Sequence, residues 1–73
     1  MNKIKPAILV IDDEDSMLRT YRSILKNSYQ PVMVNSGHAA LEKIREESFP
    51  VALLDIIMPD MDGVEVLRQI KAL

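Results

Sequence analysis

The chain has 73 residues, 48% of them hydrophobic, and its nine basic and eleven acidic residues give a net charge of −2. This length predicts a single small domain over residues 1–73, and the apolar share is typical of a packed chain rather than a disordered one. The absence of cysteine excludes a disulfide framework and a thiolate zinc site, and the balanced charge argues against a nucleic-acid or anionic-membrane surface.

The first predicted strand is the apolar segment 7–11, which follows Pro6. It shows no alternation of polar and apolar residues, which is typical of a strand buried on both faces of a parallel sheet. Apolar residues then recur at spacings of three and four, so a helix is expected, with Asp15 or Ser16 as its N-cap. The expected inward face of this helix consists of Met17, Leu18, Tyr21, Ile24 and Leu25.

The same alternation of strand and helix occurs twice more. Residues 32–34 predict the second strand, and Ser36 is the expected N-cap of the helix after it. Residues 51–54 predict a third strand that is again buried on both faces, and Asp62 is the expected cap of the last helix. The expected inward faces of these two helices are Ala40, Leu41 and Ile44, and Val64, Leu67 and Ile70. The order predicts a three-layer α/β fold, a parallel sheet flanked by helices on both faces.

Seven of the eleven acidic residues follow two of the predicted strands. Residues 12–15 follow the first strand, Asp55 ends the third, and Asp60 and Asp62 lie in the loop beyond it. Ligands of α/β sheets bind at the carboxyl ends of the strands, and neighbouring strands are about 5 Å apart. If the first and third strands are neighbours, Asp12, Asp13 and Asp55 converge on one pocket.

Three carboxylates in one pocket repel one another, and a hard divalent cation would offset that repulsion. Because the group contains neither histidine nor cysteine, it favours Mg²⁺ or Mn²⁺ over zinc. Asp55 also interrupts an apolar segment, where an unpaired charge is costly, so a functional role is expected for it. We expect His38 to be exposed on the second helix and to bind no metal.

Two segments of the sequence resemble response-regulator receiver domains. Residues 8–14, Ile-Leu-Val-Ile-Asp-Asp-Glu, are similar to the first strand and acidic pair of that family. Residues 53–63, Leu-Leu-Asp-Ile-Ile-Met-Pro-Asp-Met-Asp-Gly, are similar to its phosphoacceptor strand and following loop. The resemblance runs over the whole chain, and the joint occurrence of both motifs makes it specific.

The resemblance implies a role for each matching residue. Asp55 would accept a phosphoryl group from a sensor histidine kinase in two-component phosphorelay signalling. Asp13 would bind Mg²⁺ (or Mn²⁺) directly, Asp12 directly or through water, and the backbone carbonyl of Ile57 would be a further ligand, beside Asp55 itself. The chain would not be an enzyme, beyond catalysing its own phosphorylation.

The resemblance also implies a flavodoxin-like sheet of order 2-1-3, with residues 1–73 forming a partial receiver domain, the N-terminal half. The family's pattern continues with a fourth strand ending in Thr or Ser and a fifth ending in Lys. Without these, switching and phosphotransfer would be impaired. The strand at residues 51–54 would become a free apolar edge, and we expect a homodimer to complete the sheet there.

Other interpretations of the function remain open. The chain could be a self-associating interaction module, or an inert receiver fragment without phosphotransfer activity. A Mg²⁺-dependent phosphohydrolase is disfavoured, because its nucleophile would follow the first strand and its further motifs need a longer chain. No segment is as long and apolar as a membrane span or a signal peptide, so a cytoplasmic location is expected.

Overall fold

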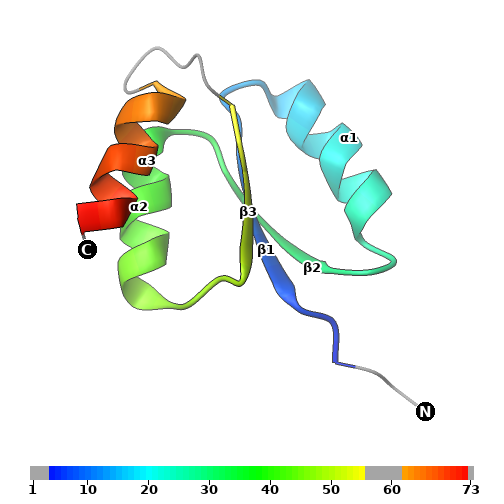
Figure 1. The fold of residues 1–73 in the computed structure, drawn as a ribbon. Helices are drawn as coiled ribbons and strands as arrows, with labels where there is room; N and C mark the ends of the chain where they lie inside the picture. Colours follow the sequence, from blue (N-terminus) through cyan, green and yellow to red (C-terminus); the bar gives the residue numbers. More distant parts are fainter. Residues whose placement is uncertain (1–3, 56–61, 73) are drawn as a thin grey trace.

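A computed structural model describes residues 4–55 and 62–72 of the chain. Within these residues strands and helices alternate (Figure 1). The elements are β1 (Ala7–Ile11), α1 (Asp15–Leu25), β2 (Gln30–Val34), α2 (Gly37–Glu46), β3 (Val51–Leu54) and α3 (Gly63–Ala72). None of the helices in this part of the chain has the length and hydropathy that crossing a bilayer requires.

The described strands form one parallel sheet of order β2-β1-β3, as the resemblance implied. Helix α1 covers one face of the sheet, and α2 and α3 cover the other, which gives three layers (Figure 1). The predicted α/β class and strand order are therefore confirmed. Because all the strands run in the same direction, their carboxyl ends lie at one edge of the sheet.

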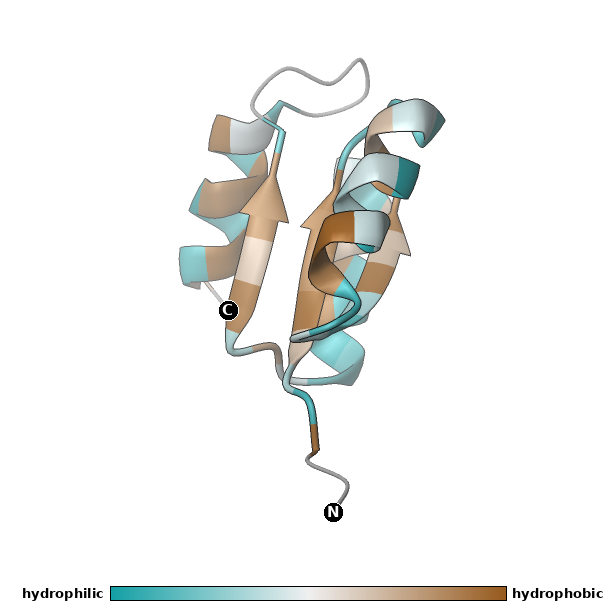
Figure 2. Cartoon of the chain, turned by 90° about the vertical axis from the view of Figure 1, so that its right-hand side faces the viewer, coloured by the Kyte–Doolittle hydropathy of each residue, from teal (hydrophilic) through white to brown (hydrophobic). Residues whose placement is uncertain are grey.

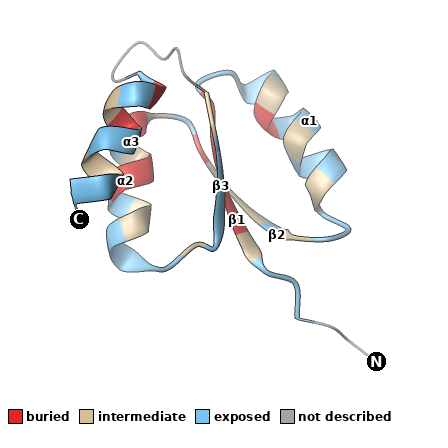
Figure 3. Cartoon of the chain, viewed as in Figure 1, coloured by how far each residue is buried: buried red, intermediate tan, exposed pale blue. Residues whose placement is uncertain are grey.

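The core is built around β1, the central strand (Figure 3). Its alternate residues point to the two faces of the sheet. Leu9 and Ile11 pack in one buried cluster, and Ile8 and Val10 pack in another, with Leu18 of α1. The partners of Leu9 and Ile11 in the first cluster are Val34, Ala40 and Val66. The prediction that the first strand is buried on both faces is thus confirmed.

The same prediction for β3 is wrong, since Val51, Ala52 and Leu53 are all exposed. The strand lies at the edge of the described sheet, so it has a neighbour on one side alone. Leu54 packs with the cluster under α2 and α3, so by alternation Val51 and Leu53 lie on the α1 face. Figure 2 shows α1 standing over the other strands and leaving that face of β3 uncovered.

Two predicted helix faces also need correction. In α3 the fully buried side chain is Val66, while Val64 and Leu67 are 54% and 46% exposed. In α1, Ile24 is 67% exposed. Both helices carry apolar residues over a wider arc than the sheet covers, so periodicity alone could not tell which of them face the core. The predicted inward residues of α2 are confirmed: Ala40 and Leu41 are buried and Ile44 packs against them.

Side chains cap two of the three helices, as predicted. The Ser36 Oγ accepts a hydrogen bond of 3.1 Å from the N–H of Ala39, and the Asp62 Oδ1 accepts one of 2.9 Å from the N–H of Glu65. The predicted cap of α1 is wrong, because its N-cap is Glu14, which makes no side-chain cap bond. This N-cap residue directly follows the acidic pair Asp12-Asp13 at the end of β1.

Substitution of Ser36 by alanine is expected to lower the free energy of unfolding by about 1 kcal/mol, because the N–H of Ala39 loses its acceptor. Urea denaturation followed by circular dichroism measures the change. Ser28→Ala, at an exposed position between α1 and β2, is the matched control and should have little effect. Equal losses in the two variants would contradict the capping role.

Candidate functional site

The candidate site lies at the carboxyl ends of two neighbouring strands. Asp12 and Asp13 directly follow β1, and Asp55 directly follows β3. The parallel register places Ile11 beside Leu54, and the N–H of Asp55 donates a 2.9 Å hydrogen bond to the carbonyl oxygen of Ile11. Sheet pairing therefore brings two segments some forty residues apart in sequence to the same point.

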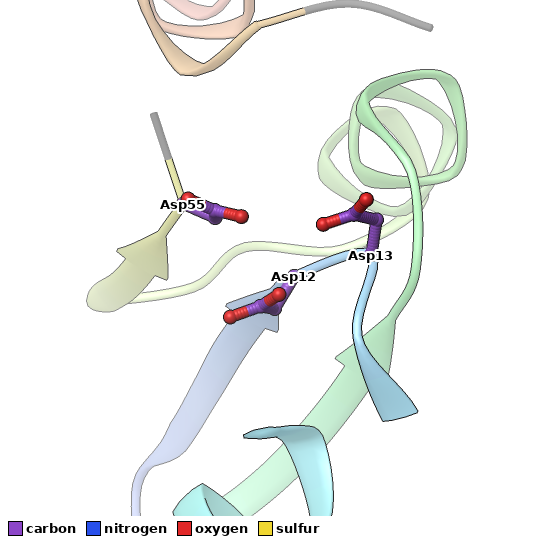
Figure 4. Close-up of side chains that lie close together, drawn as sticks. All are labelled: Asp12, Asp13 and Asp55. Atoms are coloured by element: carbon purple, nitrogen blue, oxygen red, sulfur yellow. The ribbon is translucent and has the colours of Figure 1, made fainter. Parts of the chain in front are cut away.

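The carboxylates of Asp12, Asp13 and Asp55 form a compact group, with one oxygen from each within 4.8 Å of the others. Figure 4 shows the Asp13 and Asp55 side chains directed toward one another at the ends of their strands. Asp12 is buried, Asp55 is intermediate and Asp13 is exposed. The three residues thus lie together as the sequence predicted, in a site with a buried floor and an open side.

Asp12 is positioned by its own turn. One of its carboxylate oxygens, Oδ1, accepts a 3.0 Å hydrogen bond from the N–H of Glu14, two residues further on. This bond holds the side chain at the start of α1, and Asp12 is only 6% exposed. The buried carboxylate is therefore oriented by the backbone before any ligand arrives, whereas the exposed Asp13 is open to solvent.

The donor set suits a hard divalent cation. All three groups supply oxygen, and Mg²⁺ with bonds near 2.1 Å spans about 4.2 Å between opposite ligands, close to the spread of these oxygens. Among the residues that the structure describes, this is the one cluster of three metal-ligating side chains. His38 is exposed on α2, as predicted. The residues present therefore fit Mg²⁺ or Mn²⁺.

Other residues named from the sequence cannot be placed. Ile57, whose carbonyl was the further predicted ligand, lies outside the described residues, as does Asp60. Asp62 is exposed and caps α3, so its carboxylate is engaged at the helix terminus. The described part of the site is therefore the group of Asp12, Asp13 and Asp55.

Comparison with known proteins gives one consistent result. Residues 8–73 match the family model "Response regulator receiver domain". The chain is 42% identical over 67 residues to the transcriptional regulatory protein ZraR of Escherichia coli K12, covering 90% of this chain and 15% of that protein. It is also 33% identical over 73 residues to the signal transduction histidine-protein kinase BarA of the same organism, covering 99% of this chain and 8% of BarA.

The likeness extends to solved structures. The N-terminal domain of a response regulator receiver protein from Methanoculleus marisnigri matches with a TM-score of 0.85 and 36% identity, over 90% of this chain and 55% of that one. The chain thus spans about half of that solved receiver chain and a small part of the two curated relatives. Its strands, their order and its sequence agree with one family over nearly the whole length: the chain belongs to the response regulator receiver domains.

Proposed function

We propose that the chain is a phosphoacceptor module of two-component signalling, with Asp55 as the residue that takes the phosphoryl group. The observation that supports the proposal is the group of three carboxylates at the ends of β1 and β3. Receiver domains are signalling modules rather than classical enzymes, and the family membership of this chain is established by its match. The proposal adds a role for each acid.

Asp55 is the nucleophile in this proposal. A carboxylate oxygen of Asp55 forms a bond to phosphorus while the bond from phosphorus to the donor breaks, which leaves an acyl phosphate on the protein. In transfer from a phosphohistidine, the imidazole nitrogen is the leaving group. Asp55 suits this role because it follows a strand whose backbone is fixed by the bond to Ile11, and because its side chain is less buried than that of Asp12.

Asp12 and Asp13 are proposed metal ligands. Asp55 and the Ile57 carbonyl are the other ligands that the protein would provide. A bound Mg²⁺ would neutralise negative charge between the carboxylates and the incoming phosphoryl group, which is where phosphoryl transfer is most sensitive to electrostatics. Asp12 is held by the N–H of Glu14 and gives a fixed ligand. Asp13 is exposed and can close on the cation when it arrives.

The proposed donor is a sensor histidine kinase, and the proposed location is the cytoplasm. The similarity to a segment of a protein named as a histidine-protein kinase agrees with this signalling context. In the family, the lysine that ends the fifth strand would contact the phosphoryl group. We do not assign this contact to Lys71, because it lies in the last turn of α3, at the opposite end of that helix from Asp62. Transfer to these 73 residues is therefore proposed to be slow, and switching impaired.

A small phosphodonor such as phosphoramidate tests the proposal without a kinase. Incubation of the chain with this donor and Mg²⁺ is expected to add one phosphoryl group, read as intact mass under native conditions. Addition of a chelator is expected to prevent it, because three carboxylates repel an anionic donor when no cation is bound. A folded chain that gains no mass, or that gains it equally with chelator, would contradict the proposal.

A further inference from the structure

We draw no further inference here: the strongest candidate, the row of exposed cations Arg19, Arg22 and Lys26 on α1, carries none, because the chain spans about half of the solved receiver chains that it matches and nothing in the structure shows whether the rest of such a chain or an anionic partner covers this row.

Discussion

Replacement of Asp55 by asparagine is expected to yield a folded chain to which phosphoramidate and Mg²⁺ add no phosphoryl group. The amide is nearly the same size as the carboxylate but lacks its nucleophilic oxygen, so no acyl phosphate forms. The backbone hydrogen bond from residue 55 to Ile11 does not involve the side chain and should persist. Intact mass gives the result directly, with the native chain measured beside the variant.

Asp62→Asn is the matched control for this experiment. It also removes one carboxylate from the segment after β3, but Asp62 caps α3, and an asparagine oxygen can accept the same bond from Glu65. This variant should be phosphorylated like the native chain. If Asp55→Asn still gained a phosphoryl group, another residue would be the acceptor and the proposed role of Asp55 would fail.

Stability gives a second measurement of the same substitution. The three carboxylate oxygens lie within 4.8 Å, and removal of one charge at that distance relieves repulsion on the order of 1 kcal/mol in a water-like medium. With chelator present, Asp55→Asn should therefore unfold at higher urea concentration than the native chain. Added Mg²⁺ should stabilise the native chain more than the variant, because a cation that binds the folded state more tightly raises its stability more.

The convergence of the acids was predictable from the sequence, because it depends on few features. A parallel strand order brings the ends of β1 and β3 together, and acids that directly follow each strand must then be neighbours. No knowledge of side-chain packing was needed to predict the positions of Asp12, Asp13 and Asp55. Their chemical roles, by contrast, were taken from the resemblance and remain predictions.

Burial was less predictable, because it depends on which elements stand beside each residue. The apolar segments of β1 and β3 look alike in sequence, yet β1 is central and buried, while β3 is at the edge of the sheet that the described residues form, with Val51 and Leu53 exposed. In α3 apolar residues lie on more than one side of the helix, and Val66 rather than Val64 is the one buried in the core cluster with Leu9 and Ile11. Local periodicity contains no information about neighbours that are distant in sequence.

Leu9 is the core position at which truncation is expected to destabilise the fold most. Its side chain is fully buried in the central strand and packs with Ile11, Val34 and Val66. It also lines an open pocket of about 290 Å³ beside α2 and α3, together with Ala52 and other residues. Leu9→Ala would enlarge this existing space, and such substitutions cost about 2–5 kcal/mol. A domain of 73 residues has about 4–11 kcal/mol of stability in all.

Urea denaturation at one fixed protein concentration measures this loss, so that any dimerisation contributes equally to each sample. Ile24→Ala is the matched control, because it removes the same number of carbon atoms from a side chain that is 67% exposed. We expect this control to change the free energy of unfolding by less than about 0.5 kcal/mol. Similar midpoints for Leu9→Ala and Ile24→Ala would contradict the core position of Leu9. A much lower midpoint for Leu9→Ala alone would confirm that Leu9 of β1 is a core position.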